Sequence, residues 1–169
     1  FEDGSDANLE TFTVSDAHFT GVSLNGDKVT RFSVNSPIWS RFDDIPSTVT
    51  WLDLSKTPVE ELESAKISES ITGLILEDCP KLKKLTVGPS DGNVTAIDYS
   101  VKGSSGLETI CLQNLTFPSA FFYLNERGNE TAELSFRSCK LEDNSFPGNF
   151  TSINFDHCTF ATITVSGNK

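Results

Sequence analysis

Residues 150–163 read FTSINFDHCTFATI, and their apolar side chains follow a pattern that recurs along most of the chain. With x for a mostly polar residue, the pattern is apolar-x-x-apolar-x-apolar-x-x-Cys-x-apolar-x-x-apolar. Thr, Ser, Asn and Asp fill most of the x positions. A pattern of this kind predicts a repeated structural unit.

Copies of the pattern follow one another at short intervals, and the first three are 20 residues apart. They begin at Leu9, Val29, Val49, Ile71, Leu107, Thr131 and Phe150. The cysteine position of the pattern holds Ala17, Pro37, Thr57, Cys79, Cys139 and Cys158. Between Gly88 and Gly106 the register is irregular, and Val94-x-x-Ile97-x-Tyr99 predicts an additional strand there.

The alternation in each copy predicts a short strand with one buried face. In the third copy Leu52 and Leu54 point inward and Asp53 points outward. One such strand cannot bury its apolar face alone, whereas stacking on the next copy about 4.8 Å away completes both the backbone hydrogen bonds and the core. The prediction is a mainly β coil of short parallel strands.

Weaker apolar pairs about half a step after the main ones predict that the return segments are also extended. These pairs are Val22-x-Leu24, Leu85-x-Val87, Phe122-x-Leu124 and Ile163-x-Val165. The best helix candidate, Val59–Ile67, is short, so we expect little or no helix. The predicted organisation is a loose lead-in at 1–8 and a single solenoid domain at 9–169, with an irregular segment at 88–106 and an insertion at 117–130.

The repeat resembles that of extracellular leucine-rich-repeat proteins, of an irregular kind in which other residues replace the asparagine ladder. Residues 82–112 are similar to bacterial-surface-type repeats, and a coil with strands on two faces is similar to receptor L domains. The resemblance implies a right-handed leucine-rich-repeat-like β-solenoid. It also implies a secreted or cell-surface protein with a role such as immunity or adhesion.

Composition narrows the possible partners. The net charge is −11, which disfavours nucleic acid as a partner. No apolar run approaches the roughly 18 residues of a membrane span. Four cysteines and four Asn-x-Ser/Thr sequons favour an extracellular glycoprotein with disulfides. The sequons are at Asn93, Asn114, Asn129 and Asn149.

The cysteines have two structural interpretations. Cys139 and Cys158 hold the same position in successive copies, so stacking brings them within disulfide range. They can form a bridge between copies, or they can remain free thiols packed as small hydrophobic side chains. A link between Cys79 and Cys111 is the weaker alternative, because these two differ in their place in the repeat.

The sequence offers little for catalysis, and we expect no enzyme activity, no cofactor and no metal. The two histidines, His18 and His157, are expected to be exposed turn residues. The enzymatic alternative is a polysaccharide-cleaving β-helix with paired carboxylates, for which Asp53 and Glu77 are the nearest candidates.

Solenoids present broad outward faces, so the predicted function is recognition of a protein or glycan partner. The outward positions predicted to form one contact face are Asp53, Glu77, Ser135, Arg137, Asn154 and Asp156. A rival contact surface is the aromatic insertion with Phe117, Phe121, Phe122 and Tyr123, which can instead pack on the coil as a lid. No polar cap is evident before Lys169, so we also expect the chain to continue there or to self-associate through that end.

Overall fold

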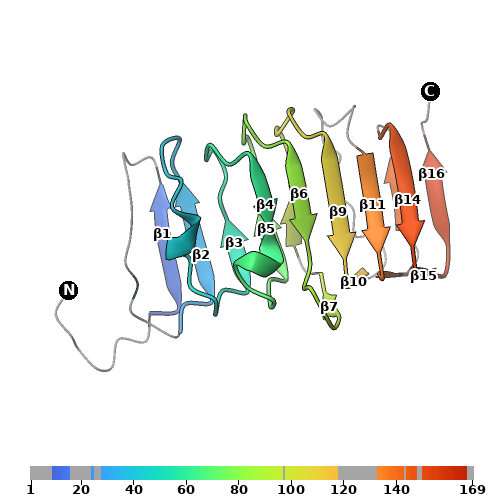
Figure 1. Cartoon of the computed structure of the whole chain (residues 1–169), viewed down its shortest axis with the longest axis horizontal. Helices are drawn as coiled ribbons and strands as arrows, with labels where there is room; N and C mark the ends of the chain where they lie inside the picture. The colour runs from blue at the N-terminus through green and yellow to red at the C-terminus, as the bar shows by residue number, and fades with distance from the viewer. Residues whose placement is uncertain are drawn as a thin grey trace.

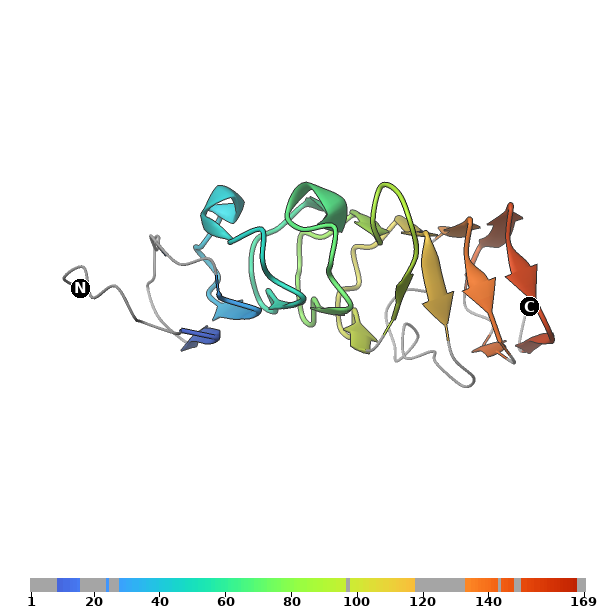
Figure 2. The same cartoon turned by 90° about the horizontal axis from the view of Figure 1, so that it is seen from below.

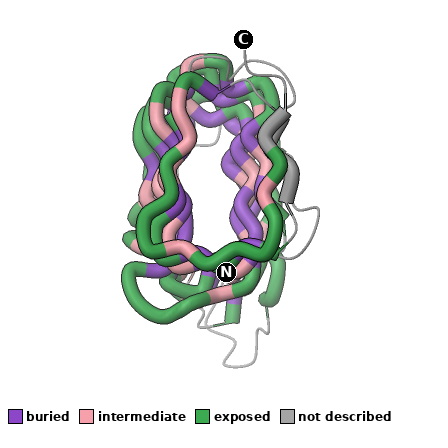
Figure 3. The backbone as a smooth tube through the Cα atoms, turned by 90° about the vertical axis from the view of Figure 1, so that its right-hand side faces the viewer, coloured by how far each residue is buried: buried purple, intermediate pink, exposed green. Residues whose placement is uncertain are grey.

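The computed structural model describes residues 9–15, 24, 28–96, 98–117, 133–142, 144–147 and 150–166, with the backbone only for 144–147 and 165–166. Within these ranges the chain winds into a β-solenoid whose strands follow one another along the long axis (Figure 1). Viewed along that axis, successive coil turns superimpose on one elongated ring (Figure 3). Buried residues face the inside of the ring, so a single core runs through the coil.

Four parallel sheets form the sides of the coil. Sheet A contains, in spatial order, β1 (Thr11–Ser15), β2 (Arg31–Asn35), β3 (Trp51–Asp53), β5 (Gly73–Ile75) and β8 (Asp98–Ser100). Sheet B contains β4 (Glu61–Glu63), β6 (Lys84–Val87), β9 (Thr109–Gln113), β11 (Glu133–Arg137) and β14 (Ser152–Asp156). Sheet C contains β7 (Val94–Thr95), β10 (Leu115–Phe117), β12 (Lys140–Leu141) and β15 (Thr159–Phe160). Sheet D contains β13 (Asn144–Pro147) and β16 (Ile163–Ser166).

Helical structure in the described part of the chain is limited to two 3₁₀ turns. These are η1 (Phe42–Asp44) and η2 (Ser64–Lys66), which lie on the same edge of the coil (Figure 2). The segment 59–67, the best helix candidate in the sequence, divides into β4 and η2. The structure thus confirms a mainly β solenoid with short parallel strands.

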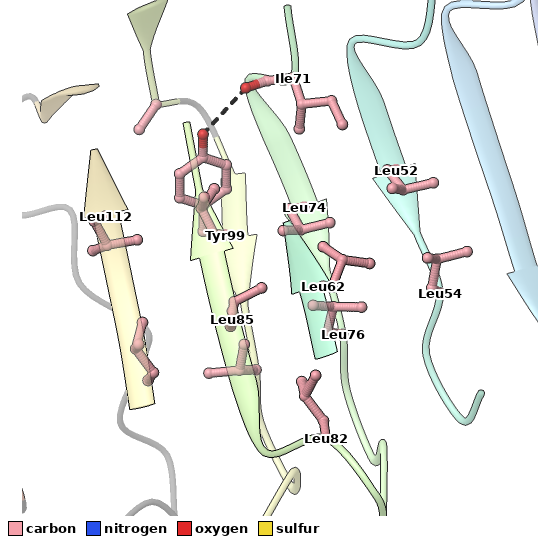
Figure 4. Packing of buried hydrophobic residues seen from close by; sticks show 14 of the residues in the cluster. Leu52, Leu54, Leu62, Ile71, Leu74, Leu76, Leu82, Leu85, Tyr99 and Leu112 are labelled. Atoms are coloured by element: carbon pink, nitrogen blue, oxygen red, sulfur yellow. Dashed lines mark hydrogen bonds between the residues drawn. The ribbon is translucent and has the colours of Figure 1, made fainter. Parts of the chain in front are cut away.

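The core follows the alternation of the repeat. Leu54, Leu76 and Phe136 are each 0% exposed, and leucines from neighbouring strands stack along the coil (Figure 4). The repeat pattern of residues 150–163 predicts that Phe155 is buried in the same way, but it is 37% exposed. The reason is that β14 is the last strand of sheet B: Phe155 stacks on Phe136, with centroids 5.1 Å apart, and no described strand covers its other side.

The repeat copies do not form one continuous row of strands, contrary to the prediction. The copies within residues 9–76 supply sheet A, whereas those that begin at Leu107, Thr131 and Phe150 supply sheet B. The pattern from Val94 to Tyr99, predicted as one strand, falls on two: β7 in sheet C and β8 in sheet A. The irregular spacing therefore marks one more passage of the coil through sheets C and A, with β9 following in sheet B.

Corners with the same geometry follow sheets A and B. At six described corners one residue has a left-handed backbone, with φ from 52° to 72°: Lys56, Asp78 and Gly103 after sheet A, and Asn114, Ser138 and His157 after sheet B. At the corners after sheet A, the residue that follows the left-handed one is Thr57, Cys79 or Ser104, and each of these is 0% exposed. Ser104 Oγ donates to the Leu76 carbonyl at 2.6 Å and accepts from Cys79 N–H at 3.0 Å. Pro37, predicted at this inward position, is exposed, and Ser36 is buried beside it.

Candidate functional site

The outer face of sheet A carries a ladder of polar side chains that bond to one another. Ser33 Oγ donates to Asp53 Oδ2 at 3.2 Å, and Ser55 Oγ donates to Asp53 Oδ1 at 2.6 Å. Ser55 Oγ also accepts from the Glu77 backbone N–H at 3.1 Å, and Ser100 Oγ donates to Glu77 Oε1 at 2.5 Å. The ladder thus connects β2, β3, β5 and β8 across four coil turns.

This ladder gives Asp53 and Glu77 a structural role. Both are partly buried, and each accepts hydrogen bonds from neighbouring serines. Asp53 lies opposite Ile75 in the β3–β5 pair, so the two carboxylates are offset by two residues along the sheet. Both Asp53 oxygens and Glu77 Oε1 have internal donors, which makes these three atoms less available to a partner or a catalytic water.

A second feature of sheet A was not found from the sequence. Trp51 lies across Gly73, where a Cβ atom would be 2.2 Å from Trp51 Cδ1. The Arg31 guanidinium carbon is 4.2 Å from the centroid of the Trp51 ring, a cation–π contact. The sequence does contain a signal for this contact, namely Gly73, because a glycine within a strand often marks the close approach of another group.

Sheet B brings the other four predicted contact residues together. In the β11–β14 pair Ser135 lies opposite Asn154, and Arg137 lies opposite Asp156. On the other side of β11, Arg137 lies opposite Gln113 of β9. Ser135 and Gln113 are partly exposed, and the remaining three are exposed.

The predicted single contact face is therefore wrong as a unit. Asp53 and Glu77 lie on sheet A, whereas Ser135, Arg137, Asn154 and Asp156 lie on sheet B. We call these four residues the sheet B cluster.

The sheet B cluster has few bonds to the rest of the molecule. Ser135 Oγ donates to the Ile110 carbonyl at a long 3.4 Å, and Asp156 Oδ1 lies 2.6 Å from His157 Nδ1. Within the described ranges, the side chains of Arg137 and Asn154 make no hydrogen bond or ion pair. The five guanidinium donors of Arg137 are thus available to an external acceptor.

The basic residues near β6 differ from Arg137, because one of them has an acidic partner. Lys81, Lys83 and Lys84 are all exposed, as expected for a solvated surface. Lys84 Nζ lies 3.0 Å from Glu61 Oε1, and this contact raises the pKa of the Lys84 ammonium. The nearby carboxylate thus offsets the charge of Lys84.

The four cysteines are free thiols in the structure. Burial raises the pKa of Cys79, and it raises that of Cys139 to about 12. Cys79 belongs to the buried column formed by Thr57, Cys79 and Ser104 at the corners after sheet A. Cys111, in contrast, is partly exposed on the outer side of β9. The weaker predicted link, between Cys79 and Cys111, therefore does not fit the coil, because the two residues belong to different columns.

Two of the sequons lie in described segments. Asn93 is exposed, and its Oδ1 accepts a hydrogen bond from the Thr116 hydroxyl. Asn114 has φ of 53°, and its Nδ2 donates to the carbonyls of Pro89 at 2.9 Å and Ser90 at 3.2 Å. The Asn114 side chain thus holds a loop, whereas that of Asn93 is accessible. Asn129 and Asn149 lie outside the described residues.

Of the remaining candidate residues, only Phe117 and His157 lie in described segments. Phe117 is 0% exposed and packs edge-on against Phe136, so it belongs to the core and not to a contact surface. Phe121, Phe122, Tyr123 and His18 lie outside the described residues. His157 is exposed at a corner, as predicted.

The described segments contain neither a metal-binding cluster nor a membrane-spanning helix. No group of three or more His, Cys, Asp or Glu residues in them could hold a metal ion. None of their helices has the length and apolar character needed to cross a membrane.

Comparison with known proteins found no matching family model, no matching curated protein and no matching solved structure.

Proposed function

We propose that the protein is an extracellular recognition module that binds a protein or glycan partner through the sheet B cluster. The observation that supports this most is the contrast between the outer faces of sheet A and sheet B. On sheet A the polar side chains bond to one another, whereas Arg137 and Asn154 on sheet B lack such bonds among the described residues.

The chemistry of the cluster suggests the kind of group that it recognises. Arg137 can form two parallel hydrogen bonds to a carboxylate of a protein side chain or an acidic sugar. Asn154 and Ser135 offer both donors and acceptors next to it, one strand spacing apart. Asp156 disfavours ligands with extended negative charge, so the expected partner presents a single carboxylate beside neutral polar groups.

The test is capture from the extracellular fluid of the source organism, followed by titration of the captured partner. Arg137→Ala is expected to weaken binding at least about tenfold, because a central arginine is a typical hot-spot residue. Arg137→Lys is expected to recover little, since the ammonium lacks the planar fork. Lys140→Ala removes an exposed positive charge from β12 on the adjoining sheet and serves as the matched control. Equal binding by wild type, Arg137→Ala and Asn154→Ala would refute the proposal.

The alternative function, glycan cleavage by paired carboxylates, is tested by a hydrolysis screen with neutral and acidic polysaccharides. The proposal expects no product. Product formation that is lost in both Asp53→Asn and Glu77→Gln would replace binding by catalysis on sheet A.

A second candidate role, self-association, is favoured by the last coil turn. Phe155 and Phe160 are 37% and 53% exposed, their ring centroids are 5.7 Å apart, and β14, β15 and β16 are the last strands of their sheets. A second copy can cover this surface, although the net charge of −11 opposes association at low salt.

Sedimentation at several protein and salt concentrations tests this role. Association that strengthens with salt and is lost in Phe155→Ser/Phe160→Ser is expected. Ile38→Ser, at an exposed apolar residue on a distant corner, is the control. A wild-type monomer at every concentration and salt level would exclude it.

A further inference from the structure

Cys139 and Cys158 occupy equivalent places in two consecutive coil turns. The pairing of β12 with β15 sets Lys140 opposite Thr159, so the residues before them are also opposite. The Thr159 backbone N–H donates to the Cys139 carbonyl at 3.0 Å, which confirms that the two backbones are adjacent at this point. Neighbouring strands lie about 4.8 Å apart, and disulfides require Cα atoms about 4.4–6.8 Å apart.

The two side chains also point in the same direction. Cys139 Sγ bonds to the carbonyl of Arg137 at 3.4 Å, and Cys158 Sγ bonds to that of Asp156 at 3.3 Å, in each case two residues earlier in the chain. Cys139 Sγ also lies 3.3 Å from the Leu112 carbonyl of the preceding turn. Both thiols therefore leave their strands on the inner side of the coil. Thiols are weak hydrogen-bond donors, so little is lost when the side chains rotate towards each other.

The two thiols differ in access. Cys139 is 1% exposed, because the next coil turn covers it. Cys158 is partly exposed, because its strand end belongs to the last turn. Burial raises the pKa of the Cys139 thiol, and the nearby Cys158 adds to that increase. Cys158 is thus the thiol that an external reagent meets first.

The other cysteines cannot compete for this pairing. Cys111 lies opposite Ser135 and faces outward from sheet B, so the backbone of the sheet separates it from the inner column. Cys79 is buried at a corner after sheet A, beside Ser104.

We propose that Cys139 and Cys158 are a redox-sensitive pair that a small-molecule disulfide, such as glutathione disulfide, converts into a covalent link between the last two described coil turns. The Cys158 thiolate attacks one sulfur of the oxidant and expels the other as a thiol. Cys139 then attacks Cys158 Sγ in the mixed disulfide and expels the second thiol. The cysteines lose two electrons and two protons, and the oxidant becomes two thiols.

The link acts on the part of the coil that neighbours cover least. Phe155 and Phe160 lie on either side of Cys158 in the sequence and are both exposed, whereas their counterparts in the preceding turn, Phe136 and Leu141, are buried. A covalent bond to the preceding turn restricts its opening and raises the stability of the coil. This proposal does not depend on a binding partner.

The experiment begins with fully reduced protein, which is incubated in a glutathione redox buffer at mildly alkaline pH. Intact mass, alkylation of remaining thiols and peptide mapping then locate the bonds. The expected product has lost two hydrogen atoms and contains a peptide that joins Cys139 to Cys158, and its melting temperature is higher by roughly 5–10 °C. Cys79→Ser/Cys111→Ser should behave like wild type.

Two variants separate bridge formation from folding. Cys158→Ser changes a partly exposed residue and should fold, yet it should show neither the bridge nor the higher melting temperature. Cys139→Ser should accumulate the mixed disulfide at Cys158, because the second step cannot occur. The proposal is overturned if both thiols remain alkylatable in folded protein after oxidation, or if the mapped bond involves Cys79 or Cys111.

Discussion

Phe136 and Phe155 provide a matched test of the continuous core, because they hold the same position in adjacent strands of sheet B. Phe136 is 0% exposed, stacks on Phe155 and packs edge-on against Phe117 at a centroid distance of 6.0 Å. Phe136→Ala removes a ring that is enclosed on all sides and leaves a cavity. The expected loss of unfolding free energy is about 3–5 kcal/mol.

Phe155→Ala removes the same ring from the open end of the column. Since this residue is 37% exposed, about three fifths of the side chain is buried. Full burial of a phenylalanine contributes about 1.5–3 kcal/mol, so the expected loss is about 1–2 kcal/mol. No cavity penalty is added, because water can occupy the space.

Urea unfolding of both variants and wild type measures the difference, provided that the slope with denaturant is unchanged. An equal loss in both variants would mean that Phe155 is buried as fully as Phe136 in solution. A loss below about 1 kcal/mol for Phe136→Ala would mean that the coil lacks the continuous core, and the fold would have to be revised.

Three further predictions follow from the buried column, the thiols and the sequons. Ser104→Ala leaves the buried Cys79 N–H without its acceptor and should lower the unfolding free energy by about 1–3 kcal/mol, whereas Ser105→Ala, at an exposed neighbour, should have little effect in the same urea assay. Burial raises the pKa of Cys139 from 9.0 to about 12, so the stability of the reduced protein should be unaffected below pH 9.0 and fall as the pH rises towards 12. Alkaline unfolding of Cys139→Ser should show a shallower fall. In protein from a secretory host, Asn93→Gln should remove a glycan seen by mass spectrometry, while Asn114→Gln should lower stability and leave the glycan mass unchanged.

The sequence predicted the strands well because alternation reports directly which side chains face the core. Leu52 and Leu54 are separated by Asp53, Leu74 and Leu76 are separated by the partly exposed Ile75, and all four leucines are buried. Stacking of these copies follows from the need to cover each apolar face, so the parallel pairing could also be predicted.

The assignment of each copy to a sheet could not be predicted from alternation alone. The pattern distinguishes side chains that face the core from those that face outward, but it is the same in sheet A and sheet B. The corners do not distinguish the walls either, because a left-handed residue and then an inward one follow β5 at Asp78 and Cys79, and also β11 at Ser138 and Cys139. The spacing did contain a usable signal. Ile110 follows Tyr99 by about half the length of a repeat, which places it in sheet B, on the other side of the coil from Tyr99 in sheet A.

The division of the predicted contact residues between two sheets shows why residue type alone could not predict which of them share a surface. Asp53 is a charged outward residue, yet serines stand beside it and satisfy its oxygens. Arg137 is also charged and outward, but its neighbours across the strands are Gln113 and Asp156, and it bonds to neither side chain. In a parallel coil each outward side chain faces the equivalent residues of the turns before and after. On sheet A these neighbours include serines that donate to the carboxylates, whereas on sheet B the side chains of Arg137 and Asn154 face neighbours to which they do not bond, and this difference is the basis of the proposed contact surface.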